Sequence, residues 1–163
     1  MVKRGGDIRS ERDLAGRKVV VARGTTNEAA MRVFAAKQGR AFELEVADDF
    51  AQALERLSTG AVDALAADDV LIAGFLAGND PRGNYAMVGG PLSHEPYGII
   101  FARADEPLAE VVRQAFRRLA TTREIRWIYD KWFLRTLPSG TRLGLPMSAE
   151  LQRSFEVLGL PPD

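Results

Sequence analysis

The hydrophobic and polar positions in the first part of the chain switch repeatedly between two periods. Short valine- or leucine-rich runs, one of them strictly alternating with charged residues, are typical of buried or half-buried strands. Between these runs, apolar residues recur at three- and four-residue spacing, which predicts amphipathic helices. The predicted strands are Arg17–Ala22, Phe42–Val46, Val62–Ala67, Tyr85–Val88 and Tyr97–Phe101. The predicted helices are Glu28–Gln38, a helix through Leu57 that Asp48 or Asp49 caps, and Val70–Ala77. Strands that alternate with helices of this length indicate βαβ units, so we predict an α/β fold with a mostly parallel sheet flanked by helices.

The C-terminal part has a different pattern, because predicted helices follow one another without strands between them. The helices are one with Pro107 in its first turn, one from Arg123 to Phe133, and one that Ser148 caps. We therefore expect two parts, residues 1–101 and residues 102–163. Trp127, Tyr129 and Trp132 fall within one predicted helix and are expected to form core or a docking face.

The sequence Gly24-Thr25-Thr26 stands between a predicted strand and a predicted helix. A glycine turn that leads into a helix start leaves free backbone N–H groups and the positive end of the helix dipole. Such a turn binds anions, including the carboxylate of a small molecule. The alternative is that Thr25 or Thr26 only caps its own helix.

Asp68 follows another predicted strand. Ligands of open parallel sheets bind beyond the carboxyl ends of the strands, so Asp68 and the glycine turn are expected to face one crevice. There a carboxylate would accept hydrogen bonds from an ammonium group while the helix start holds a carboxylate, which is half of an α-amino-acid site. The alternative for Asp68 is capping of the next helix, a role that Asp69 could equally fill.

The composition excludes several other classes of function. The 163 residues include 22 Lys and Arg against 22 Asp and Glu, and no stripe of basic residues with interleaved aromatics, so we predict no nucleic-acid partner. Cysteine is absent and His94 is the single histidine, so we assign no metal, no cofactor and no thiol catalysis; His94 is expected to be a surface or loop residue. No apolar run is long enough to span a bilayer, and the N-terminus has no apolar segment of a signal peptide.

An ordered set of motifs resembles the periplasmic solute-binding proteins of polar amino-acid ABC transporters. The set consists of Asp13–Val19, Gly24-Thr25-Thr26, Gly60–Asp68, Tyr97-Gly98 and Ile128–Phe133. More narrowly, Arg23–Thr26, Ala67–Asp69, Glu95–Gly98 and the tail beyond Pro138 are similar to the glutamate/aspartate-binding branch. The resemblance implies the second lobe of a type II periplasmic binding fold, a three-layer lobe with C-terminal helices that normally pack on a first lobe, most of which we expect to be absent from this chain.

The resemblance also implies roles for particular residues. Thr25 and Thr26 would hold ligand carboxylate oxygens, and Asp68 would receive the α-ammonium group. Gly24 and Phe50 are also predicted to bind the ligand, and Phe50 stands where that branch often has a histidine. Such proteins are not enzymes: they close around an amino acid in the periplasm and deliver it to the membrane subunits of an ABC transporter. No exporting segment is expected within this chain.

Two other functions are compatible with a two-lobed fold of this kind. One is a dehydratase acting on a cyclic amino or keto acid, with Asp68 or Glu95 as general acid. The other is a ligand-sensing domain of a membrane receptor. We also expect the C-terminal helices to expose an apolar face that includes Ile125, Trp127 and Trp132, which predicts either a homodimer through this face or a rearranged packing of the C-terminal helices.

Overall fold

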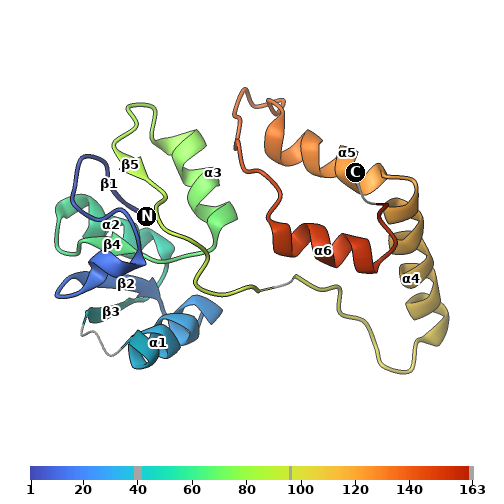
Figure 1. The fold of residues 1–163 in the computed structure, drawn as a ribbon, viewed down its shortest axis with the longest axis horizontal. Helices are drawn as coiled ribbons and strands as arrows, with labels where there is room; N and C mark the ends of the chain where they lie inside the picture. The colour runs from blue at the N-terminus through green and yellow to red at the C-terminus, as the bar shows by residue number, and fades with distance from the viewer. Residues whose placement is uncertain (39–41, 96, 162–163) are drawn as a thin grey trace. The chain divides into compact units, whose positions relative to one another are not determined.

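A five-stranded sheet with helices on both faces forms the first part of the chain (Figure 1). The computed structural model describes residues 1–38, 42–95 and 97–161, and its contacts divide the chain into two units, Met1–Glu95 and Pro96–Asp163. The elements of the first unit are β1 (Val2–Lys3), η1 (Glu11–Leu14), β2 (Lys18–Ala22), α1 (Thr26–Gln38), β3 (Glu43–Ala47), α2 (Phe50–Thr59), β4 (Ala64–Leu65), α3 (Asp69–Asn79) and β5 (Tyr85–Ala86). The sheet has the strand order β3-β2-β4-β1-β5.

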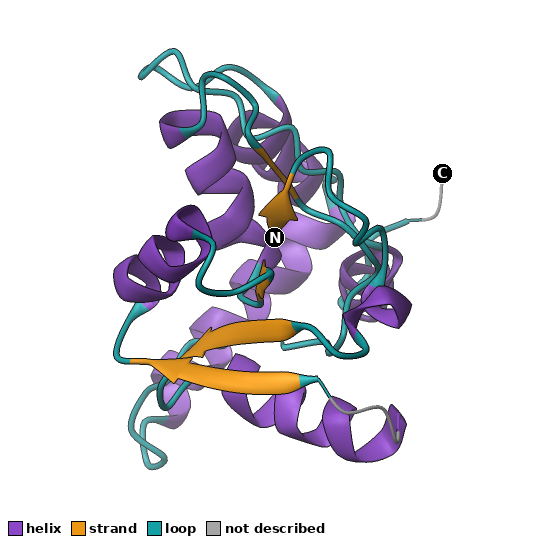
Figure 2. Cartoon of the chain, turned by 90° about the vertical axis from the view of Figure 1, so that its left-hand side faces the viewer, coloured by secondary structure: helices purple, strands orange, loops and turns teal. Residues whose placement is uncertain are grey.

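The sheet is mostly parallel, as predicted. β2 pairs in parallel with β3 along its whole length and with β4 on its other side, whereas β1 runs antiparallel to both β4 and β5. Figure 2 shows β2 and β3 side by side, with their arrowheads pointing the same way and helices on either side of them. β1 was not predicted, because its two residues are too few to show a period.

The valine run of β2 supplies both faces of the sheet because successive strand residues point to opposite sides. Val20 packs in one core cluster with residues of α2 and α3, including Leu57 and Ile72. Val19 and Val21 pack in a second cluster with Met31 of α1. All these side chains are buried, so the first unit has three layers, with α2 and α3 on one face and α1 on the other.

The second unit is helical. Its elements are α4 (Glu106–Thr121), α5 (Glu124–Tyr129), a π-helical segment η2 (Asp130–Leu134) and α6 (Ala149–Val157). The predicted helix Arg123–Phe133 is therefore divided, because the hydrogen-bond spacing widens after Tyr129. Ser148 caps α6, as predicted, by accepting a hydrogen bond from the Leu151 N–H.

Two expectations about the second unit are wrong. Tyr97–Phe101 is irregular rather than a strand, since no described strand pairs with it to form a ladder. Ile125 is buried rather than exposed: it packs with Ala120 of α4 and Leu160 beyond α6. Trp127 and Trp132 are about half exposed, as expected.

Candidate functional site

Three parallel strands end side by side at one edge of the first unit. β3, β2 and β4 are neighbours in that order and run in the same direction, so the residues that follow them meet beyond their carboxyl ends. The Arg23 N–H donates to the Ala47 carbonyl at 2.8 Å, which joins the first residue after β2 to the end of β3. This edge is where ligands of open parallel sheets bind.

A cavity of about 290 Å³ lies at this edge. Residues from all three strand ends line it, together with the helices that follow. The lining residues are Ala22, Arg23, Thr25, Asn27, Asp48, Asp49, Phe50, Ala53, Leu65, Ala66, Ala67 and Leu71. A mainly apolar wall with a few polar groups is the usual lining of a small-molecule site, and the volume is at the lower end of the range for such sites.

Hydrogen bonds within the Gly24-Thr25-Thr26 turn fix its shape. Gly24 has a φ of +69°, a left-handed conformation that glycine adopts without strain. The Thr25 hydroxyl donates to the Ala22 carbonyl at 2.8 Å and accepts the Glu28 N–H at 3.2 Å, so Thr25 does cap α1. Thr26, the first residue of α1, is exposed at the edge.

Glu28 also takes part in this turn, although no sequence pattern had pointed to it as a site residue. Its carboxylate accepts the Gly24 N–H at 2.8 Å and pairs with the Arg32 guanidinium, also at 2.8 Å. The hydrogen bond from Arg32 and that from Gly24 hold the pKa of Glu28 below its ordinary value. The Gly24 amide thus already has an anion within the turn as its partner.

Asp68 is half-buried at the position before α3, but its side chain makes no capping hydrogen bond with the described start of that helix. Asp69 instead accepts the Val70 N–H at 2.7 Å. The Asp68 carboxylate accepts a hydrogen bond from Asn27 Nδ2 at 2.9 Å, and Asn27 lines the cavity. The geometry therefore argues against the capping alternative for the Asp68 side chain and connects the ends of β2 and β4.

The end of β3 contributes the other polar part of the cavity wall. Asp49 caps α2 by accepting the Gln52 N–H at 2.8 Å, and Asp48 lies 3.4 Å from Arg23 Nε. Phe50, the first residue of α2, is half-buried and contacts the core cluster formed with α2 and α3.

Of the five residues predicted to bind ligand, Thr25 and Phe50 line the cavity, Gly24 and Thr26 flank Thr25, and Asp68 adjoins it through Asn27. Their role in binding stays a prediction. Arg23, Asn27, Asp48 and Asp49 were missed as lining residues, although Asp48 and Asp49 were recognised as helix caps. These residues could not be placed at the cavity from the sequence, because it is the strand order that brings the end of β3 beside the Gly24-Thr25-Thr26 turn.

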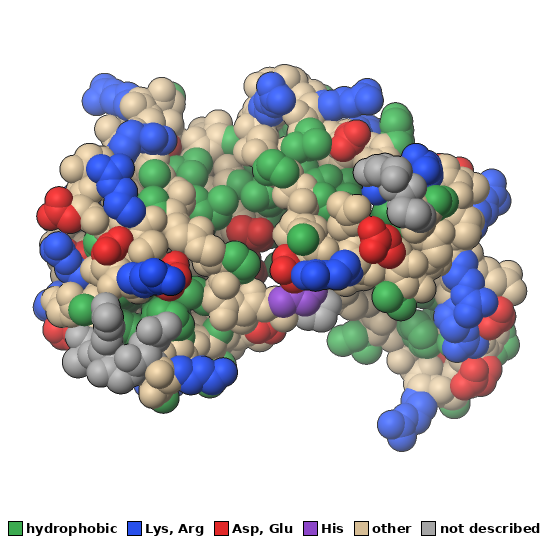
Figure 3. Space-filling model, in the orientation of Figure 1, with side chains coloured by type: hydrophobic (Ala, Val, Ile, Leu, Met, Phe, Trp, Pro, Cys, Tyr) green, Lys and Arg blue, Asp and Glu red, His purple; other side chains and the backbone are tan. Residues whose placement is uncertain are grey.

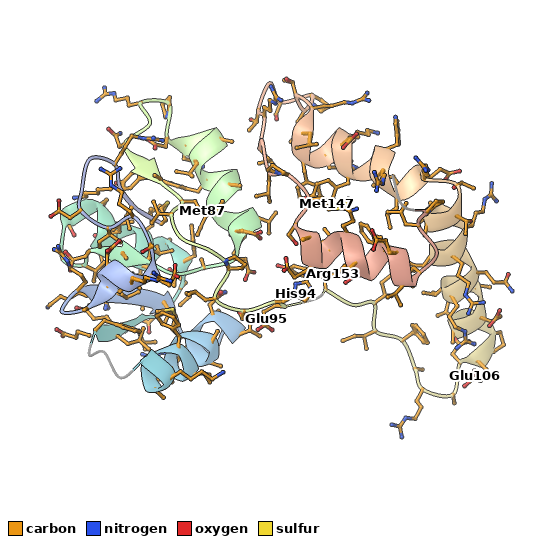
Figure 4. All side chains as sticks on the ribbon, viewed as in Figure 1. Met87, His94, Glu95, Glu106, Met147 and Arg153 are labelled. Atoms are coloured by element: carbon orange, nitrogen blue, oxygen red, sulfur yellow. The ribbon has the colours of Figure 1, made fainter. Side chains whose placement is uncertain are left out.

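Other candidate chemistry lies elsewhere or is missing from the described residues. His94 and Glu95 are exposed on the segment after β5, and neither is among the described residues that line the cavity (Figure 4). Within residues 1–38, 42–95 and 97–161, no group of three or more His, Asp or Glu side chains could hold a metal ion, and no helix has the length and apolar character to cross a membrane. Basic and acidic side chains are interspersed on the face shown in Figure 3.

An open sheet whose parallel strands end at a small cavity defines the class of this unit as an α/β ligand-binding lobe.

No family model matches the chain. By sequence, it is 31% identical over 152 residues to the L-glutamate/L-aspartate-binding protein of Pseudomonas aeruginosa, covering 93% of this chain and 50% of the relative. It is 29% identical over 157 residues to the glutamate/aspartate import solute-binding protein of Salmonella typhimurium, covering 96% of this chain and 52% of the relative.

A solved structure gives the same answer. An ancestral arginine-binding protein bound to glutamine matches with a TM-score of 0.64 and 32% sequence identity, over 82% of this chain and 58% of the other. In sequence and in fold, the chain is similar to amino-acid solute-binding proteins of ABC transporters, which confirms the resemblance stated from its motifs. The chain spans about half the length of the curated relatives it matches.

Proposed function

We propose that the first unit is one ligand-binding lobe of an amino-acid solute-binding protein, and that its cavity holds the zwitterionic part of the ligand. The observation that carries this proposal is the convergence of two opposite kinds of group at one sheet edge. The start of α1 offers N–H groups and a positive dipole end to a carboxylate, and the half-buried Asp68 offers a carboxylate to an ammonium group.

The mechanism would be capture rather than catalysis. An amino acid that contacts both lobes favours the closed state through its additional contacts there. In this proposal residues 1–101 form the second lobe, and residues 102–163 form the helical segment that packs on the first. The protein would work in the periplasm and pass its ligand to the membrane subunits of an ABC transporter.

The catalytic alternative has less support. A dehydratase needs a general acid in the cavity. Glu95, one of the two candidates, is exposed on the segment after β5, and Asp68 already accepts a hydrogen bond from Asn27. We therefore propose no bond-breaking step for this chain.

A binding experiment tests the proposal through the two charged groups of the ligand. The isotopically labelled chain is titrated, with NMR detection, with L-glutamine and with two analogues, one without the α-carboxylate and one without the α-ammonium group. Loss of the bidentate grip of the other lobe costs about 2–5 kcal/mol, or roughly thirty- to several-thousand-fold in affinity, so we expect weak binding.

The proposal requires that L-glutamine binds and that each analogue binds at least about tenfold more weakly, since each loses a charge-assisted hydrogen bond. Equal binding of all three ligands would contradict it. Micromolar or tighter binding by the monomeric chain would contradict the expected need for a second lobe.

The homodimer is a separate part of the proposal. Trp127 and Trp132 are 53% and 50% exposed, and Lys131 Nζ lies 5.2 and 5.5 Å from the centres of their rings. Exposed aromatic surface of this kind favours association. Light scattering should therefore give a dimer mass that falls to the monomer mass in a Trp127→Ser/Trp132→Ser variant; a monomer at high concentration would refute the homodimer.

A further inference from the structure

The charged residues among the described lining of the cavity are Arg23, Asp48 and Asp49, so one guanidinium faces two carboxylates. Arg23 Nε lies 3.4 Å from Asp48 Oδ1, so the positive charge of Arg23 is balanced by the Asp48 carboxylate. The Asp49 carboxylate is held at the start of α2 by the N–H of Gln52. The end of β3 therefore gives the cavity a net negative charge, before Asp68 is counted.

The apolar part of the same wall lies next to these acids. Phe50 directly follows Asp49 and lines the cavity together with Ala53 of α2 and Leu71 of α3. An aliphatic stem can pack on such residues, and a guanidinium group can stack on an aromatic ring while it pairs with a carboxylate. A side-chain carboxylate would face the two acids instead.

We propose that the cavity selects the ligand by its side-chain charge, preferring a guanidinium side chain to a neutral amide and an amide to a carboxylate, with Asp49 as a residue that sets this order. This rests on the proposed function, which assigns the α-ammonium to Asp68 and the α-carboxylate to the start of α1. The charged lining groups that then remain for the side chain are Asp48 and Asp49 at the end of β3 and Arg23, which is already paired with Asp48. The order is thus the reverse of a preference for glutamate or aspartate.

The size of the effect follows from the exposure of these acids. A charge about 5 Å from an exposed carboxylate is attracted or repelled only enough to change Kd about fivefold, because water screens the pair. Attraction for one ligand and repulsion for the other together amount to about a 30-fold difference in Kd. Salt reduces this difference because the groups are partly solvated.

The test is a competition between side chains on the same backbone. The labelled chain is titrated with L-arginine, L-glutamine and L-glutamate at one ionic strength, and again at higher salt. Asp49→Asn removes the charge and keeps a residue that caps a helix well, so the fold is expected to persist. Asp105→Asn is the matched control, since Asp105 caps α4 in the same way, through the Leu108 N–H at 3.1 Å, and is not among the residues that line the cavity.

We expect L-arginine to bind about 30-fold more tightly than L-glutamate, with L-glutamine between them, and the ratio to fall severalfold in Asp49→Asn but not in Asp105→Asn. Equal or tighter binding of L-glutamate would overturn the inference and leave the proposed function standing. An unchanged ratio in Asp49→Asn would overturn the role of Asp49. Failure of all three amino acids to bind would overturn the proposed function and this inference with it.

Discussion

Replacing Asp68 by asparagine separates a ligand-binding role from a structural one. The Asp68 side chain makes no capping hydrogen bond with the described start of α3, and asparagine retains an oxygen that can accept the hydrogen bond from Asn27 Nδ2. The variant should therefore change the free energy of unfolding by less than about 0.5 kcal/mol. A hydrogen bond to a charged group contributes about 1.5–3 kcal/mol, so the affinity for an α-amino acid should fall about 10- to 150-fold.

Asp49→Ala provides the contrasting variant for the stability measurement. Asp49 accepts the Gln52 N–H at 2.8 Å, and loss of an N-cap costs about 1 kcal/mol. In a unit of this size that corresponds to a fall in Tm of about 4–8 °C. Thermal unfolding and an amino-acid titration are measured on both variants. If Asp68→Asn lowered Tm as much as Asp49→Ala and left the affinity unchanged, Asp68 would be a structural residue and the reasoning would be refuted.

Three further predictions concern individual positions. Gly159→Ala should destabilise the second unit by more than about 1 kcal/mol, measured by thermal unfolding, because Gly159 has a φ of +106° and an added Cβ would lie 3.2 Å from Thr121 Cγ2; an unchanged Tm would contradict this. Gly24→Ala should cost about 1 kcal/mol through its φ of +69° and should weaken amino-acid binding, whereas full affinity would show that the turn's shape does not matter. Burial raises the pKa of Asp80, but hydrogen bonds from the N–H groups of Asn84 and Tyr85 outweigh burial and hold the pKa below 3.8. The stability that these bonds contribute is therefore present at neutral pH and lost in acid. The free energy of unfolding in urea should accordingly vary less with acid pH in Asp80→Asn than in the parent protein.

Local sequence signals predicted the parts of the fold that depend on local physics. The run Lys18–Ala22 forms β2 because valine favours a buried strand, and Ser148 caps α6 because its hydroxyl accepts a nearby N–H. β1 could not be predicted, since its two residues are extended only through pairing with β4 and β5, far away in the sequence. Tyr97–Phe101 shows the converse: a strand-like pattern does not by itself make a strand, and none of the described strands forms a ladder with this segment.

The same distinction applies to the candidate site. The Gly24 turn and Asp68 could be recognised because each stands at the junction of a predicted strand and helix. Arg23, Asn27 and Asp49 could not be placed at the cavity from sequence, because their proximity depends on the order β3-β2-β4 and on side-chain contacts between elements. The groups proposed for the ligand backbone could therefore be found from the sequence, whereas those proposed for its side chain could be found only from the structure.

The central claim is that the ends of β2, β3 and β4 together form an amino-acid site. Amide shift mapping on the labelled chain during titration with L-arginine tests it most directly. We predict that the changes concentrate at Gly24–Asn27, Asp48–Phe50 and Ala67–Asp68, and that they are lost with an analogue that lacks the α-ammonium group. Changes confined to the second unit, or the same changes with that analogue, would contradict the claim.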